Sequence, residues 1–210
     1  MSSREAILDR VRTALGDRPA ARAAPRGYRR RGDLDREGRV ALFCERVGDY
    51  RAEVRRVPAR EVRAAIAEAL AARGARRVAV PPSLPAVVRP DGLELVDDHG
   101  LPPGELDALD GVVTGCTLAI AETGTIVLSG GAVDGRRALT LVPDLHVCVV
   151  VESQVVELVA ESMELLSGLV QRERRPLTFV SGPSATSDIE LSRVEGVHGP
   201  RNLVVIVAGA

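Results

Sequence analysis

Residues 147–151 have the sequence Val-Cys-Val-Val-Val, an uninterrupted apolar run that predicts a strand buried on both faces. Similar short runs predict further strands at 51–57, 78–80, 93–96, 111–114, 125–128, 177–180 and 203–207. Segments typical of helices separate several of these runs, at 35–48, 58–74 and 154–172. Strands and helices that alternate in this way favour an α/β fold with three layers, α/β/α, around a mostly parallel sheet.

The first 38 residues are expected to stand apart from this domain. Ser2 and Glu5 have the spacing of a capping box, and apolar residues then recur at helical intervals up to Gly16. Residues 17–38 are rich in Arg, Ala, Pro and Gly, with too few apolar side chains to anchor a core. We therefore divide the chain into an N-terminal helix and arm, residues 1–38, and an α/β domain, residues 39–210. The arm is interpreted as a solvated linker or as a segment that wraps around a partner subunit.

The charged residues exclude several classes of chemistry. The 210-residue chain has a formal net charge of −1, so no strong overall field attracts it to nucleic acid or to an anionic membrane. Within the arm, only Tyr28 offers an aromatic platform for stacking a base, which also argues against nucleic-acid binding. All 28 basic residues are Arg. A Schiff-base amine, a lysine general base and a P-loop lysine are excluded, because arginine keeps its proton and cannot replace lysine in these roles.

The three cysteines, Cys44, Cys116 and Cys148, lie far apart and form no C-x-x-C pair. We therefore expect neither an iron–sulfur cluster nor a zinc site on this chain. His99 and His146 are weak candidates for function, and without H-x-x-x-H spacing no metal site is predicted. No apolar run reaches the roughly 18 residues of a membrane-spanning helix, and the N-terminus lacks the apolar stretch of a signal peptide. A cytoplasmic location with reduced thiols and no membrane span is expected.

A first loop with candidate functional residues leads into the predicted strand at 125–128. Its glycines permit backbone conformations that other residues avoid, and its threonines place hydroxyls beside a single carboxylate. That carboxylate, Glu122, is a candidate general base, hydroxyl-orienting group or nucleophile. The candidate binding residues here are Gly115, Thr117, Thr123, Gly124 and Thr125. The alternative is a tight turn whose hydroxyls satisfy backbone groups.

A second loop, residues 181–190, follows the predicted strand at 177–180. A hydroxyl-rich turn between a strand and a helix directs backbone N–H groups and the positive helix end toward an anion, and a small carboxylate would suit it. The candidate binding residues are Ser181, Gly182, Ser184, Asp188 and Glu190. Ser187 and Glu190 also have capping-box spacing, so the same segment can simply cap a helix.

A third motif, residues 196–201, precedes the last predicted strand. His198 stands between two glycines and can exchange a proton near neutral pH, while Arg201 can hold a carboxylate in a bidentate pair. Oxidation of a 2-hydroxy acid requires both functions. His198 joins Glu122 as a candidate catalytic residue, and Gly199 and Arg201 are candidate binding residues. A Gly-Pro turn with a surface histidine is the alternative.

Taken in order, these motifs resemble the lactate-utilisation protein C family, whose members share the LUD domain. The resemblance covers about residues 40–210 and rests on 114–116 with 119–126, then 139–143, 181–190 and 196–201. It implies a fold like that of the glucosamine-phosphate deaminase, ribose-phosphate isomerase and CoA-transferase group. It also implies that two iron–sulfur partner proteins act with this chain in oxidising L-lactate to pyruvate. The clusters are then expected on the partners, with no cofactor bound by this chain.

The resemblance leaves alternatives open. A sugar-phosphate isomerase that depends on lysine is excluded, because the chain has no Lys. A CoA-transferase-like enzyme with Glu122 as its nucleophile, or another stand-alone enzyme that uses Glu122 and His198, is one alternative. A non-catalytic assembly subunit, for which the arm matters more than these two side chains, is another.

Overall fold

The centre of the molecule is a six-stranded sheet, seen in a computed structural model that describes residues 2–16, 23–25, 27–186, 194–196 and 198–209. Its strand order is β1-β12-β7-β4-β2-β3, and every neighbouring pair is parallel. The strands are β1 (Glu53–Val57), β2 (Arg77–Val80), β3 (Glu94–Asp97), β4 (Gly111–Thr114), β7 (Leu145–Val151) and β12 (Asn202–Ala208). The predicted mostly parallel sheet is confirmed.

Strand β7 shows why the apolar run of the sequence has to be continuous. Val147 and Val149 pack on one face of the sheet against α3 (Val62–Ala71). Cys148 and Val150 point to the opposite face and pack in a separate core cluster. Because both faces are covered, residues 145–150 of the strand are all buried, and no polar alternation remains in the sequence.

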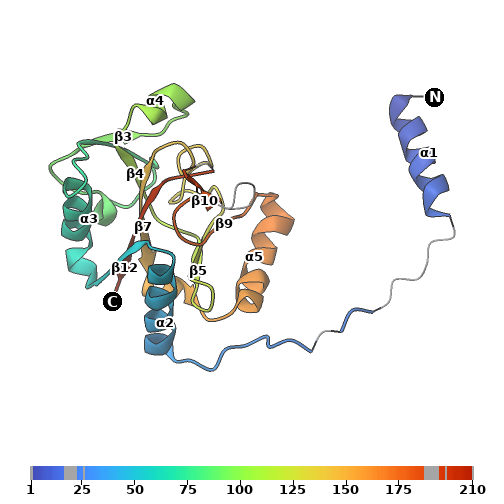
Figure 1. Cartoon of the computed structure of the whole chain (residues 1–210), viewed down its shortest axis with the longest axis horizontal. Coiled ribbons are helices and arrows are strands. Elements are labelled where there is room, and N and C mark those ends of the chain that lie inside the picture. The colour runs from blue at the N-terminus through green and yellow to red at the C-terminus, as the bar shows by residue number, and fades with distance from the viewer. Residues whose placement is uncertain (1, 17–22, 26, 187–193, 197, 210) are drawn as a thin grey trace.

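The opposite face is covered by α2 (Arg36–Asp49) and by a second sheet of four strands. This sheet has the order β8-β5-β6-β9. Its strands are β5 (Leu118–Ile120), β6 (Thr125–Leu128), β8 (Val155–Val156) and β9 (Thr178–Val180), and β6 runs antiparallel to both β5 and β9. Helix α5 (Val159–Glu173) packs on its outer side through Leu166, which contacts Leu118 and Ile120. Figure 1 shows α3 on one side of β7 and β12, with α2 and α5 on the other.

Grouping strands 125–128 and 177–180 with the central sheet was therefore wrong. The chain reverses at Gly124, which has a φ of +57°, so β5 and β6 form a hairpin rather than parallel neighbours. The predicted helix at 154–172 also begins later than expected. The Glu161 carboxylate accepts hydrogen bonds from the backbone N–H groups of Glu157 and Leu158, and these bonds fix the start of α5.

The remaining elements are short, except for one helix near the N-terminus. They are α1 (Ser3–Leu15), η1 (Ala59–Glu61), η2 (Ala86–Val88), α4 (Pro103–Asp107), η3 (Glu152–Gln154), β10 (Ala185–Thr186) and β11 (Val194–Glu195). Among the described residues, no helix has both the length and the apolar character needed to cross a bilayer.

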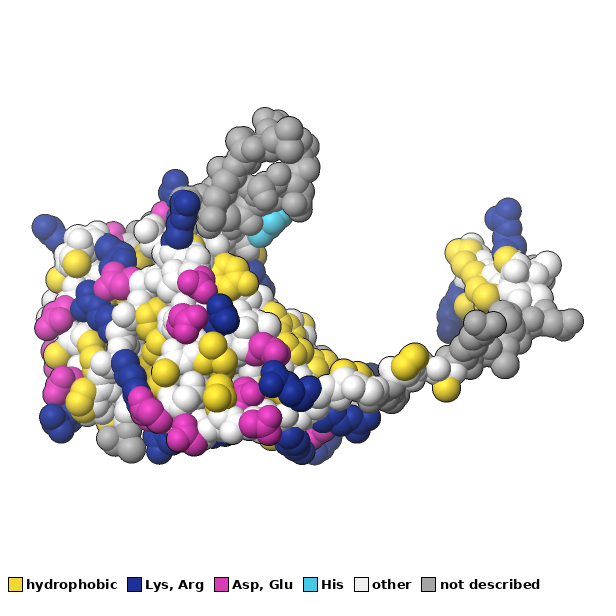
Figure 2. Space-filling model, turned by 60° about the horizontal axis from the view of Figure 1, so that its bottom comes forward, with side chains coloured by type: hydrophobic (Ala, Val, Ile, Leu, Met, Phe, Trp, Pro, Cys, Tyr) yellow, Lys and Arg dark blue, Asp and Glu magenta, His cyan; other side chains and the backbone are white. Residues whose placement is uncertain are grey.

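Helix α1 keeps the predicted capping box between Ser2 and Glu5, and none of its residues is buried. Figure 2 shows it apart from the rest of the molecule, with hydrophobic side chains along one side.

Acidic and basic side chains are mixed over the visible surface of the main body, in keeping with a net charge of −1. Helix α2 begins at Arg36, just inside the segment that we assigned to the arm.

Candidate functional site

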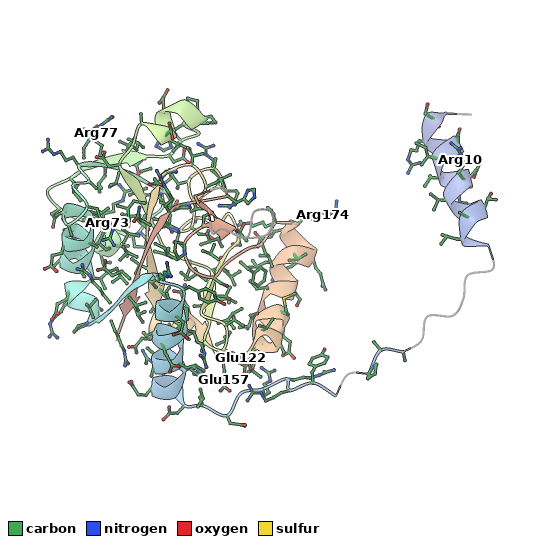
Figure 3. The ribbon with its side chains drawn as sticks, viewed as in Figure 1. Arg10, Arg73, Arg77, Glu122, Glu157 and Arg174 are labelled. Carbon is green, nitrogen blue, oxygen red and sulfur yellow. The ribbon has the colours of Figure 1, made fainter. Side chains whose placement is uncertain are left out.

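Glu122 lies in the turn between β5 and β6. A Cβ atom on Gly124 would lie 2.7 Å from the backbone of Arg46, so this turn packs against α2 too closely for any side chain at 124. The Glu122 N–H donates to the carbonyl oxygen of Glu157 over 3.0 Å. Arg29 Nη2 donates to Glu122 Oε1 over 2.9 Å, which brings the arm onto the predicted catalytic carboxylate. Figure 3 labels Glu122 and Glu157 beside the arm.

A pocket of about 700 Å³ lies beside Glu122. The arm contributes Tyr28 and Arg29 to its wall, and the first turns of α5 contribute Val159 and Met163. Glu122 also lines it, with its carboxylate paired with Arg29. The pocket is mainly apolar, and His198 does not line it.

A chain of hydroxyl groups links the first loop to the second. Thr123 Oγ1 and Thr125 Oγ1 are 2.7 Å apart, and Thr125 Oγ1 is 2.8 Å from Ser181 Oγ. Three predicted binding residues are thus brought together, because antiparallel pairing of β6 with β9 sets Ser181 beside Thr125. Ser181 in turn lines a second pocket.

Gly115 and Thr117 hold a neighbouring turn instead. Thr117 Oγ1 donates to Asp134 Oδ2 over 2.9 Å, and the Gly115 N–H donates to the carbonyl oxygen of Val133 over 2.9 Å. Asp134 is buried, and its Oδ2 also accepts the backbone N–H of Ser129. Through these contacts, Gly115 and Thr117 help to hold the 129–134 turn in place.

The second pocket, of about 220 Å³, unites the two C-terminal motifs of the sequence. The predicted residues that line it are Ser181, Gly182, Ser184, His198 and Gly199. The His198 N–H donates to Ser184 Oγ over 3.0 Å, and the Ser184 N–H donates to the carbonyl oxygen of Pro200 over 2.9 Å. Segments 181–184 and 198–200 therefore form one site.

Arg137, Thr140 and His146 also line this pocket, and the sequence analysis did not select the first two. Arg137 and Thr140 were not predicted as site residues, although they flank the start of the 139–143 motif. His146, a weak candidate from the sequence, is buried at the start of β7. Its Nε2 is hydrogen-bonded to Thr114 Oγ1 over 2.8 Å, which fixes the orientation of the imidazole.

Other predicted residues are not brought into this pocket. Glu122 lines the larger pocket, so the structure does not unite Glu122 and His198 in a single site. Arg201 Nε donates to Asp144 Oδ1 over 2.7 Å, so Arg201 pairs with a carboxylate of the protein itself. Asp188 and Glu190, with the proposed cap at Ser187, lie outside the described residues.

The residues that line the second pocket suit a small polar ligand. The residues that line its volume of about 220 Å³ carry one guanidinium, several hydroxyls and two imidazoles. A guanidinium binds carboxylates bidentately, and an imidazole exchanges protons near neutral pH. The arrangement is therefore able to hold a small acid and to assist proton transfer.

Known proteins resemble this chain, one of them over nearly its whole length. A family model described as LUD domain matches residues 105–208, a segment that contains Glu122, Arg137 and His198. A Deinococcus radiodurans protein named Lactate utilization protein C is 48% identical, and the alignment covers 99% of this chain and 98% of that protein. A Bacillus pumilus protein of the same name is 37% identical over 42% of this chain and 38% of its own length. The crystal structure of a DUF162 family protein from Deinococcus radiodurans has a TM-score of 0.73 and 44% identity, and it covers 84% of this chain and 100% of its own.

Proposed function

The chain belongs to the lactate utilization protein C family, and on this premise we propose that it is a component of a bacterial L-lactate utilisation system. The observation that carries the proposal is the 48% identity, over 99% of the chain, to a protein with that name. A match of this length includes the N-terminal arm as well as both pockets, so the relationship extends beyond a shared domain. The LUD-domain match at 105–208 supports the same assignment.

We further propose that the chain acts with two iron–sulfur proteins in the oxidation of L-lactate to pyruvate. This reaction releases two electrons and two protons, and the electrons require a carrier. A cubane iron–sulfur cluster takes four cysteine thiolates, whereas this chain has three cysteines. Cys116 and Cys148 are also buried in the core of the domain, where their thiols are out of reach of a cluster. These features support clusters on the partners rather than on this chain.

The proposed compartment is the cytoplasm. All three cysteines are free, and Cys116 and Cys148 are buried in the core of the domain. Free buried thiols are compatible with a reducing compartment, where disulfides do not persist.

Growth of a deletion strain tests the proposed function. Removal of the gene from its native host is expected to abolish growth on L-lactate and to leave growth on pyruvate unchanged, because only the oxidation step is lost. A plasmid copy of the wild-type gene should restore growth on L-lactate. Normal growth of the deletion strain on L-lactate as sole carbon source would overturn the proposal.

A further inference from the structure

Arg137 is the feature of the second pocket that points to a ligand. Its Nη1 donates to the carbonyl oxygen of Thr140 over 3.1 Å and lies 3.3 Å from Thr140 Oγ1. Its Nη2 donates to the carbonyl oxygen of His198 over 3.3 Å. Both partners are neutral groups, and within the part of the chain that the structure describes no carboxylate pairs with this guanidinium. The positive charge at the pocket wall is therefore not neutralised by these contacts.

Arg136, the residue before Arg137, pairs fully with a carboxylate. Arg136 Nε and Nη2 donate to the two carboxylate oxygens of Asp98 over 2.7 and 2.8 Å. Asp98 is buried, so this ion pair is a structural contact between two loops. The two neighbouring arginines thus differ in their partners: Arg136 has a bidentate carboxylate, and Arg137 has only carbonyl and hydroxyl oxygens.

The Arg137 guanidinium also has an edge left for a ligand. No described residue accepts a hydrogen bond from its Nε. The residue as a whole is exposed, so a molecule in the pocket can reach it. Burial of part of the side chain lowers the pKa of Arg137, because the charged group loses hydration there. An anion in the pocket would replace that lost hydration.

We propose that Arg137 is the carboxylate-binding residue of this pocket, and that the pocket takes a small 2-oxo or 2-hydroxy monocarboxylic acid. Two N–H groups of the guanidinium edge bind the carboxylate. The oxygen on the second carbon is then held among Ser184, His146 and His198, which line the same volume. A volume of about 220 Å³ admits an acid of three or four carbons. The choice of these acids rests on the proposed function, whereas the position of Arg137 does not.

Calorimetric titration of the purified full-length chain tests this assignment, with sodium pyruvate and sodium L-lactate as the probes. The wild-type chain is expected to bind at least one of the two acids. Arg137→Gln should weaken that binding about tenfold to a hundredfold, the loss that follows from removing a charge-assisted hydrogen-bond pair. Arg137→Lys keeps the charge but not the planar fork, so its affinity should fall between the two.

A matched control is Arg63→Gln on α3, because Arg63 pairs with Asp91 and lies outside the pocket. This variant should bind the acids as the wild-type chain does. Far-ultraviolet circular dichroism and the thermal midpoint establish that each variant is folded, and Arg137→Lys serves as the test if Arg137→Gln does not fold. The proposal is overturned if a folded Arg137 variant binds the acids with wild-type affinity. It is equally overturned if the wild-type chain binds neither acid, or if it binds inorganic phosphate in their place.

The binding experiment tests the assignment of the pocket, and the growth experiment tests the proposed function, so their outcomes can be told apart. If the deletion strain does not grow on L-lactate but Arg137→Gln binds pyruvate normally, only the assignment of the pocket is wrong. If the deletion strain grows on L-lactate while Arg137→Gln has lost its affinity for pyruvate, the proposed function is wrong and the carboxylate site remains.

Discussion

The guanidinium of Arg29 binds the carboxylate of Glu122, with 2.9 Å between Nη2 and Oε1. The same guanidinium approaches the buried carboxylate of Glu157, where Nη1 and Oε1 are 3.7 Å apart. Arg31 and the backbone N–H groups of 32 and 34 add contacts to the first turns of α5 and to Glu157. The last part of the arm is therefore attached to the domain, at the carboxylate that sequence reasoning selected as a catalytic residue.

Gly32→Ala tests this attachment. An added Cβ would lie 2.0 Å from Glu157 Cδ, so the hydrogen bond of 2.7 Å from the Leu34 N–H to Glu157 Oε2 cannot be kept. We expect hydrogen exchange of the Leu34 amide to become about tenfold faster or more, since a hydrogen bond to a charged group contributes ~1.5–3 kcal/mol. Gly27→Ala is the control, because no atom lies within 4 Å of its added Cβ. Unchanged exchange in Gly32→Ala would show that the arm is not held there.

Glu122→Gln separates the arm-binding role of Glu122 from a catalytic one. The pair with Arg29 is half-exposed, so its loss should change the free energy of unfolding by no more than ~1 kcal/mol. Because Glu122 already has a partner within the chain, we expect a strain carrying Glu122→Gln to keep growing on L-lactate. Glu68→Gln, an exposed carboxylate on α3, provides the comparison. Loss of growth with a folded Glu122→Gln protein would instead support a catalytic role for Glu122.

Substitution of two adjacent leucines of α5 tests how much the packing of this helix on the second sheet contributes to the free energy of unfolding. Leu166 is 1% exposed and packs on Leu118, Ile120 and Val127, whereas Leu165 is 63% exposed. Urea unfolding should show that Leu166→Ala lowers the free energy of unfolding by about 2–5 kcal/mol. Leu165→Ala should change it by no more than about 0.5 kcal/mol. Equal effects of the two substitutions would contradict the packing of α5 described above.

Asp98 gives the protein an acid-sensitive contact. Burial raises the pKa of Asp98, but hydrogen bonds from Arg136 and from the backbone N–H groups of Leu101 and Gly100 outweigh it, so the pKa lies below 3.8. A carboxyl group whose pKa is lowered by folding stabilises the protein above its unfolded pKa, and this contribution is lost as the pH falls through the folded value. We therefore expect the contribution of Asp98 to be complete at pH 6 and to decline below pH 3.8.

Asp98→Asn isolates this contribution. At pH 6 the variant should be less stable than the wild-type chain by about 1.5–3 kcal/mol, because Arg136 loses its charged partner. The difference should shrink as the pH is lowered from 4 to 2 in urea unfolding experiments. A difference that stays constant over this range would mean that Asp98 is not ionised in the folded protein.

Much of the central sheet could be predicted from the sequence, because strands buried on both faces leave a strong apolar signal. The strand at 111–114 was found with its correct ends, and the run at 147–151 was found within β7. The second sheet could not be predicted in the same way. Val155 and Val156 form the two-residue strand β8, but a short apolar run directly before a helix cannot be told from the helix itself. Its pairing with β5 depends on the tertiary fold.

The candidate site was predicted in part. Ser184 and His198 were selected from local motifs, and the structure brings them into one pocket. Arg137 carried no local signal, because what distinguishes it from Arg136 is a distant residue, Asp98, which pairs with one arginine and not with the other. Arg201 was selected for its charge, yet its partner Asp144 is 57 residues away in the sequence. Long-range pairing of charges decides which arginine is available to a ligand, and the sequence does not reveal it.

A crystal structure of the full-length chain with bound pyruvate tests the central claim most directly. We expect the pyruvate carboxylate to lie within hydrogen-bonding distance of the Arg137 guanidinium, with the keto oxygen among Ser184, His146 and His198. Pyruvate bound in the larger pocket beside Glu122 and Arg29, with the Arg137 pocket holding only water, would contradict it.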